Sequence, residues 1–263
     1  MGQTDHDEVR YERRDGIAII TIDRPDVYNA FTRSTILELN ETLERAATDD
    51  GVYAVVLTGA GDAFCAGADV TSMPDWADQS EEEYAGYLWA VQNVVRRLRR
   101  MATPSVAAVD GPAVGAGCDF ALACDLRVAG PEAVFREGFV RVGLVPGDGG
   151  AWLLPRLVGE SRAREYLLTG RDIPAEEAAE VGLVVEVADH PRQAARDLAA
   201  EIRDLPATAV RRTNRLIDPE MGLEAHLERA TAYQWECVTD DEHREAVAAF
   251  AEDREPSFDR EYN

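Results

Sequence analysis

The sequence contains no lysine, no Cys-x-x-Cys pair and no apolar run that approaches the roughly 18 residues of a membrane span. Its polar N-terminal segment, residues 1–16, also lacks the apolar core of a secretion signal. The cysteines stand apart in sequence, mostly among small or apolar neighbours, which is typical of reduced thiols; they are Cys65, Cys118, Cys124 and Cys237. These absences predict a cytoplasmic protein without disulfides and without a membrane partner.

The lack of lysine accompanies a strong excess of acid. Fifty Asp and Glu residues face 27 basic residues, all of them arginine, for a net charge of −23 on 263 residues. Such a surface repels nucleic acid, so no nucleic-acid partner is expected, and its self-repulsion is relieved only where salt screens it. The composition resembles that of haloarchaeal proteins; the alternative is an ordinary acidic cytosolic protein.

Short apolar runs alternate with helical patterns over most of the chain. Strands are expected at residues 17–22, 53–59 and 104–111, and helices at 33–48 and 80–101. This alternation predicts an α/β fold with largely parallel strands. From about residue 190, four helical patterns follow one another without a strand between them. The sequence therefore predicts a catalytic and ligand-binding core over residues 1–195 and an all-helical region over 196–263.

Two loops of small residues, 59–69 and 111–120, each follow an expected buried strand. Small residues let the backbone approach a ligand closely, and two N–H groups aimed at one oxygen form an oxyanion hole. Dinucleotide binding is the competing interpretation of the second loop. It is disfavoured because Phe120 takes the third small position of G-x-G-x-x-G/A and no acid ends a second strand where one is expected.

Four stretches carry a family resemblance: DRPDVYNAF, GAGDAFCAGADV, VDGPAVGAGCDFALACDLRVA and GLVPGDGGAWLLPRLVG. In this order and spacing they resemble the enoyl-CoA hydratase/isomerase, or crotonase, superfamily over roughly residues 15–190. The resemblance implies an α/β spiral of β-β-α turns, a C-terminal helical region that builds trimers or hexamers, and an acyl-CoA substrate. Coenzyme A is then part of the substrate, and no separate cofactor or metal is expected.

The resemblance also assigns the binding residues. The backbone N–H groups of Ala68 and Ala116 fall at the two oxyanion-hole positions, and Ala66 and Asp69 fall where relatives hold the adenine end of CoA.

Arg24 lies beside the loop that meets the pantetheine and phosphates in relatives. With no lysine available, Arg24 and Arg254 are the candidates for the CoA phosphates, because the guanidinium fork suits phosphate. A plain surface charge is the alternative for Arg24.

The carboxylates decide the reaction that is possible. Asp119 is the residue at the family position of one hydratase glutamate, three residues after Ala116, and on a helix the two would share a face. A helix-terminal or ion-paired Asp is the alternative. The second hydratase glutamate would fall at Phe139. Glu137 could partly substitute if the segment is extended, since residues two apart then share a face, but a surface or CoA-facing acid is the preferred interpretation.

Asp148 is the remaining candidate acid. The stretch around it resembles the phenylacetate-pathway isomerase branch, which has an aromatic at the position of Phe139 and its working Asp one place earlier, at Gly147 here. Asp148 is therefore either a displaced catalytic base or the N-cap of the next helix. Since only one family glutamate position keeps an acid, we favour double-bond isomerisation over hydration. Hydrolysis, decarboxylation and dehalogenation on the same scaffold, or acyl-CoA binding without turnover, are the alternatives.

Overall fold

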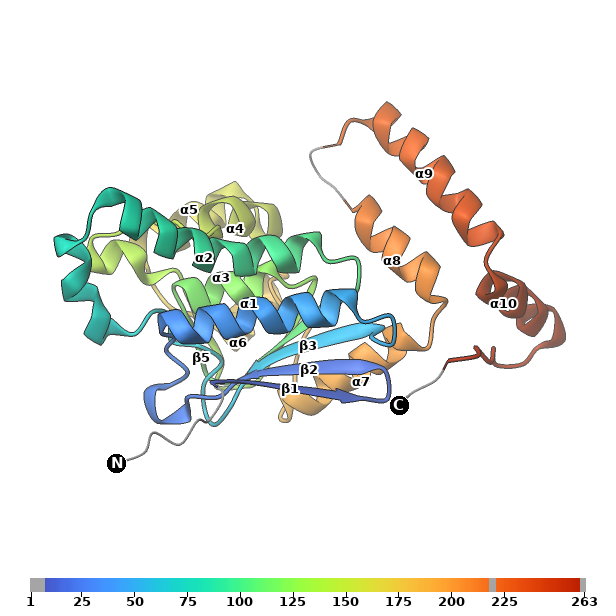
Figure 1. The fold of residues 1–263 in the computed structure, drawn as a ribbon, viewed down its shortest axis with the longest axis horizontal. Coiled ribbons are helices and arrows are strands. Elements are labelled where there is room, and N and C mark those ends of the chain that lie inside the picture. Colours follow the sequence, from blue (N-terminus) through green and yellow to red (C-terminus); the bar gives the residue numbers. More distant parts are fainter. Residues whose placement is uncertain (1–7, 218–220, 261–263) are drawn as a thin grey trace.

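The computed structural model describes residues 8–217 and 221–260 (Figure 1). Two sheets form its core. The larger has the strand order β1-β2-β3-β4-β6-β9, and the smaller the order β5-β7-β8. The strands are β1 (Val9–Arg14), β2 (Ile17–Ile22), β3 (Ala54–Gly59), β4 (Ser105–Val109), β5 (Pro112–Val114), β6 (Leu126–Ala129), β7 (Val134–Arg136), β8 (Ile173–Pro174) and β9 (Glu186–Val187). The pairs β1–β2 and β7–β8 are antiparallel and the other pairs parallel, so the predicted α/β class is confirmed.

Helices connect and cover the strands. The α-helices are α1 (Arg33–Thr48), α2 (Glu81–Arg100), α3 (Ala116–Ala123), α4 (Gly150–Val158), α5 (Glu160–Thr169), α6 (Ala175–Glu180), α7 (Pro191–Arg203), α8 (Ala207–Leu216), α9 (Leu223–Val238) and α10 (Asp241–Glu252). Short 3₁₀ helices are η1 (Pro25–Val27), η2 (Val70–Asp78) and η3 (Gly138–Val142). In the described residues, no helix is both long and apolar enough to cross a bilayer.

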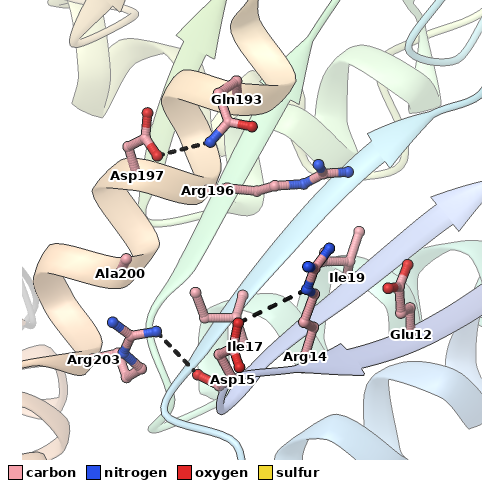
Figure 2. A pocket seen from close by; sticks show the side chains of 10 residues that line it. All are labelled: Glu12, Arg14, Asp15, Ile17, Ile19, Gln193, Arg196, Asp197, Ala200 and Arg203. Atoms are coloured by element: carbon pink, nitrogen blue, oxygen red, sulfur yellow. Dashed lines mark hydrogen bonds and ion pairs between the residues drawn. The ribbon is translucent and has the colours of Figure 1, made fainter.

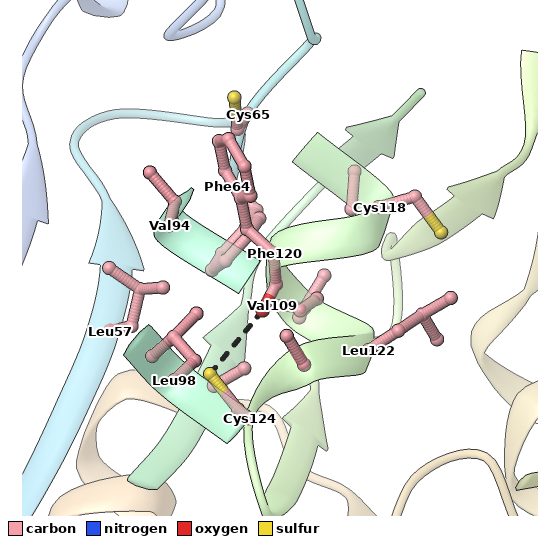
Figure 3. Packing of buried hydrophobic residues seen from close by; sticks show 14 of the residues in the cluster. Leu57, Phe64, Cys65, Val94, Leu98, Val109, Cys118, Phe120, Leu122 and Cys124 are labelled. Carbon is pink, nitrogen blue, oxygen red and sulfur yellow. Dashed lines mark hydrogen bonds between the residues drawn. The ribbon is translucent and has the colours of Figure 1, made fainter. Parts of the chain in front are cut away.

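The larger sheet is covered on both faces. On β2, Ala18 and Ile20 belong to the core beneath α1, α2 and α3, while Ile17 and Ile19 pack with α7 on the opposite face. This alternation follows from the two-residue period of a strand. Figure 3 shows the core on the α3 side, where Phe120 is packed among the buried side chains. Because every residue of α3 is buried, this helix is fixed in place on all sides.

The C-terminal helices differ from the rest. Neither α8 nor α9 buries a residue, and both stand away from the sheets in Figure 1. Large apolar side chains remain exposed there, including Leu223, Trp235 and Phe250. The predicted division at residue 195 falls inside α7, whose Ala195 and Ala199 pack on the sheet. The helices that leave the core thus begin after α7.

The segment after β7 is not the strand-like run that its apolar residues suggest. Only Val134–Arg136 is extended, and residues Gly138–Val142 form η3. The 3₁₀ helix ends at Gly143, whose φ of 74° is readily adopted only by glycine. The argument that Phe139 and Glu137 share a strand face is therefore wrong.

Candidate active site

Two loops leave the same edge of the larger sheet, because β3 and β4 are parallel neighbours. The first loop follows β3, and the second leads through β5 into α3. Backbone hydrogen bonds join them: Cys65 N–H donates to the Pro112 carbonyl at 3.1 Å, and Val114 N–H donates to the Cys65 carbonyl at 2.9 Å. A Cβ on Gly67 would lie 2.7 Å from the Val114 oxygen, and Gly67 has a φ of 89°. Only glycine permits so close an approach of the two loops.

The N–H groups of Ala68 and Ala116 lie on these adjoining loops. Phe31 N–H donates to the Gly67 carbonyl at 2.8 Å, and Asp69 N–H donates to the Phe31 carbonyl at 3.0 Å. Ala68 itself makes neither bond, so its N–H is directed away from Phe31. Ala116 begins α3, where a helix offers its own N–H groups no acceptor. Across residues 8–217 and 221–260, neither N–H has a protein acceptor.

Alanine is compatible with this position. The left-handed conformation at the start of α3 falls on Gly115, with a φ of 55°, and Ala116 does not have a positive φ. The free N–H of Ala116 also lies at the positive end of the helix dipole. Two free N–H groups on neighbouring loops, one at a helix N-terminus, are suited to stabilise a developing oxyanion.

Three carboxylates converge beside the start of α3. Asp119 lies in its first turn, Glu137 directly follows β7, and Asp148 precedes α4. The pairing of Val114 with Arg136 brings Glu137 level with Gly115. A Cβ on Gly150 would lie 2.4 Å from both Asp119 Oδ1 and Glu137 Oε2. The two carboxyl groups therefore meet over a residue that has no side chain.

The three acids are almost entirely removed from solvent, with exposed fractions of 0% for Asp119, 1% for Glu137 and 7% for Asp148. Both oxygens of Asp119 and of Glu137, and Oδ1 of Asp148, have no hydrogen-bond partner in the described part of the chain. An unpaired buried charge is costly, so burial favours the protonated form of each acid.

The pKa values shift accordingly. Burial raises the pKa of Asp119 well above its ordinary value, and the neighbouring charges of Glu137 and Asp148 add to the effect. Burial raises the pKa of Glu137 to about 7 and that of Asp148 to about 6. Near neutral pH, Asp119 is therefore biased toward its protonated form, Glu137 lies near the midpoint of its titration, and most of Asp148 is ionised. Acids tuned in this way serve proton transfer.

The chain matches the sequence model of the Enoyl-CoA hydratase/isomerase family over residues 12–261. The chain belongs to this family. It is 34% identical over 250 residues to the short-chain-enoyl-CoA hydratase of Clostridium acetobutylicum, covering 92% of this chain and 94% of the relative. With the crotonyl-CoA hydratase of Syntrophomonas wolfei it shares 31% over 261 residues, covering 96% and 98%.

Solved structures agree with the sequence relatives. The crystal structure of an enoyl-CoA hydratase from Bacillus anthracis superposes with a TM-score of 0.90 at 29% identity, covering 97% of this chain and all of that one. The predicted crotonase fold is confirmed, and the chain is an enoyl-CoA hydratase/isomerase family enzyme.

Three structural interpretations of the acids that the sequence allowed are wrong. Glu137 is not a surface acid, because it is buried against Asp119 beneath Gly150. Asp148 is not the cap of the following helix: the N-cap of α4 is Gly149, and no side chain caps it. Asp119 is not ion-paired either. All three acids are thus available for chemistry.

Phe139 stands where the sequence resemblance predicts the second hydratase glutamate. Its half-buried ring stands 3.6 Å from where a Cβ on Gly115 would lie, directly over the start of α3. The sequence predicts that Phe139 contacts the substrate. Its location beside the candidate oxyanion hole is compatible with that prediction.

The predicted CoA-binding residues lie on the first loop and the segment beside it. The Arg24 guanidinium pairs with Glu8 at 3.1 Å and Asp69 at 3.6 Å and also donates to the Ala30 carbonyl. Hydrogen bonds from Thr71 lower the pKa of Asp69, and Arg24 contributes in the same direction. Ala66, three residues before Asp69 in the chain, is half-buried. Arg24 would have to exchange carboxylates for phosphates to bind CoA.

Arg254 lies in the C-terminal region and is likewise paired, with Glu245 at 2.6 Å and Glu252 at 2.7 Å. In the part of the chain that the structure describes, no hydrogen bond or ion pair joins Arg254 to the two loops. Among the residues the structure describes, no group of three or more His, Cys, Asp or Glu is arranged to hold a metal ion.

Two concave surfaces of the molecule show how the acid cluster is placed relative to solvent. A groove of about 1930 Å³ runs between α2, α4 and α8, and Asp148 lines it together with Gly147 and Gly149. A smaller concavity of about 360 Å³, between the β1–β2 hairpin and α7, has mixed charges and none of the candidate site residues (Figure 2). The acid cluster therefore opens toward the larger groove only through Asp148.

Sequence reasoning missed Gly150 and the tyrosines near Asp148. The charge of Asp148 raises the pKa of Tyr84 and Tyr87, although burial is the larger cause for both. The ring of Trp76 lies 5.8 Å from that of Tyr84 and 5.7 Å from that of Tyr87. The Gly-Gly pair after Asp148 could have indicated the importance of Gly150. Nothing in the sequence pattern of α2 indicated a role for the tyrosines.

Proposed function

We propose that the enzyme hydrates a 2-enoyl-CoA thioester, with Asp119 and Glu137 as the acid–base pair. The thioester oxygen would lie between the N–H groups of Ala68 and Ala116. The observation that carries the proposal is the meeting of Asp119 and Glu137 at Gly150. The sequence favoured isomerisation because it predicted only one acid at the family positions. Glu137 beside Asp119 is a second acid, so that reason no longer applies. The relatives named as hydratases support the same conclusion.

The chemistry needs one ionised and one protonated acid in the pair. An ionised carboxylate takes a proton from water as the water oxygen bonds to Cβ, and the double-bond electrons move to the thioester oxygen. The two N–H groups stabilise the resulting enolate. The enolate then collapses as the other acid gives its proton to Cα. One acid has gained a proton and the other has lost one, so the pair holds the same number of protons as before.

Isomerisation through Asp148 is the second candidate, favoured by two observations. Asp148 does not cap α4, and its pKa of about 6 leaves it mostly ionised at neutral pH. A single carboxylate can carry a proton from Cα to Cγ of a 3-enoyl-CoA, through a dienolate whose oxygen the same two N–H groups stabilise. Isomerisation would also give a role to Asp148, the third acid, which hydration does not need.

Two substrates and three variants separate the reactions. With a 2-enoyl-CoA, Asp119→Asn and Glu137→Gln are expected to lower the hydration kcat by about 10²–10⁴-fold, the usual loss of acid–base catalysis. Asp148→Asn should retain most hydration and lose conversion of the 3-enoyl-CoA. Full hydration by both Asp119→Asn and Glu137→Gln would refute the pair. Loss of hydration in Asp148→Asn alone would make Asp148 the working acid instead.

We further propose that the protein assembles as a homotrimer, or a hexamer of two trimers, through α8–α10. The exposed Trp235 and Phe250, and the absence of buried residues on α8 and α9, support a partner for these helices. Light scattering coupled to size exclusion would give the mass directly. A monomer at working salt would contradict the proposal.

The net charge of −23 supports a protein that operates at high ionic strength, where repulsion between its acids is screened. The cytoplasmic location stays a prediction from the sequence.

A further inference from the structure

Asn29 is a fully buried polar residue outside the acid cluster, and all its side-chain hydrogen-bonding groups are used. Its Nδ2 donates to the carbonyls of Ala63 at 2.7 Å and Ala60 at 2.8 Å, and its Oδ1 accepts from Arg24 N–H at 2.9 Å. The first two bonds reach across to the loop after β3, and the third closes the loop that carries Asn29 itself. One side chain thus joins two separate loops.

The requirement for asparagine follows from this geometry. The residue needs two donors and one acceptor on a short side chain, and its φ of 58° lies in the left-handed region. Aspartate cannot donate when ionised, serine has one donor, and glutamine is longer by a methylene. Asparagine is also among the few non-glycine residues that readily adopt a left-handed conformation.

The loop that Asn29 holds carries the Ala68 N–H. Tyr28, just before Asn29, accepts from Ala66 N–H at 3.0 Å, and Phe31, two residues after it, bonds to both Gly67 and Asp69. Residues 66–69 therefore run along residues 28–31 and move with them. The Ala116 side has an additional anchor, from Gly115 N–H to the Arg136 carbonyl at 2.8 Å, besides the bonds that join the two loops. A change at Asn29 should therefore displace the Ala68 N–H more than the Ala116 N–H.

We propose that Asn29 is a positioning residue for the oxyanion hole: its bridge between the two loops sets the placement of the Ala68 N–H. This inference rests on the proposed role of Ala68 as a donor to the thioester oxygen. Asn29 touches no substrate and acts through the backbone. A misplacement of about 1 Å at a catalytic group is enough to slow a reaction about 10²-fold.

The test compares Asn29→Asp with Asn40→Asp. Asn40 is a matched control, because its Nδ2 also bridges two carbonyls, those of Ile36 at 2.9 Å and Ala90 at 3.0 Å, but joins α1 to α2 away from both loops. The probe is 2,4-hexadienoyl-CoA with ¹³C at the thioester carbonyl, bound to the full-length protein. Isotope-edited infrared spectroscopy reports the polarisation of that carbonyl, which a residue with only a structural role would not change.

We expect the carbonyl band to shift to lower frequency on binding to the wild type and to Asn40→Asp, and to shift by about half as much on binding to Asn29→Asp. The hydration kcat of Asn29→Asp should fall about 10²-fold, with KM changed less than about threefold. A wild-type band shift in Asn29→Asp would overturn the inference and leave the proposed function standing. No shift in the wild type would overturn the proposed oxyanion hole itself.

Asn29→Gly replaces Asn29→Asp if the latter does not fold, since glycine keeps the left-handed backbone while it removes the bridge. The same two outcomes apply to it.

Discussion

Adding one methyl group at Gly150 is expected to disable the acid pair without unfolding the protein. The Cβ of Gly150→Ala would lie 2.4 Å from Asp119 Oδ1 and Glu137 Oε2, so each oxygen must retreat by about 0.6 Å or more to reach a contact that real Cβ atoms make. The backbone accepts alanine, because Gly150 begins α4 without a positive φ. The displaced carboxylates should lower the hydration kcat about 10²-fold.

The variant should lose some stability but remain folded, with a net loss of at most about 3 kcal/mol. Overpacking a buried site destabilises by about 1–3 kcal/mol, and alanine recovers up to about 1 kcal/mol of helix propensity over glycine. Gly147→Ala is the matched control in the same turn, since the nearest atom to its Cβ would be Leu88 Cδ2 at 3.7 Å, an ordinary contact. The assay is the loss of near-ultraviolet absorbance of a 2-enoyl-CoA, with thermal unfolding measured in parallel. Full activity in Gly150→Ala would refute the argument that this pair is catalytic.

Three further predictions concern pH, CoA and salt. The raised pKa of Glu137 means that the folded state binds the proton more tightly, so this acid destabilises the fold increasingly as pH rises from 4.5 to about 7. Glu137→Gln should therefore be more stable than wild type by roughly 3 kcal/mol at pH 8 and similar to it at pH 4, measured by thermal unfolding. Arg24→Ala should raise KM for a CoA thioester but not for an N-acetylcysteamine thioester, and equal KM changes would exclude a phosphate contact. Tm should rise with NaCl from 0.1 M upward, about 5 °C or more per tenfold step, and a flat profile would contradict a high-salt working environment.

The fold and the two loops could be predicted because their signals are local. Buried strands have a recognisable apolar pattern, and positions such as Gly67 and Gly115 need glycine for reasons that small-residue motifs reveal. The partner of Asp119 could not be predicted in this way. Glu137 reaches it because β7 pairs with β5 in one particular register, and then because η3 turns the chain directly after Glu137. Both are long-range or conformational facts that an apolar run does not encode.

Asp148 illustrates a second limit. Aspartate before a helix is usually a cap, and sequence pattern alone does not distinguish a cap from a buried acid one residue earlier. The deciding fact is that α4 begins at Gly150, so that Gly149 takes the cap position and leaves Asp148 outside the helix. A one-residue difference in helix start thus separates a structural role from a chemical one.

The three acids form a graded path to water. Asp119 and Glu137 are sealed, and Asp148, the most exposed of the three, is the one that lines the large groove. Proton exchange between the inner pair and solvent is therefore expected to pass by way of Asp148. In deuterated water, the deuterium taken from the attacking water would remain on the acid that accepted it, while Cα would receive the hydrogen held by the other acid.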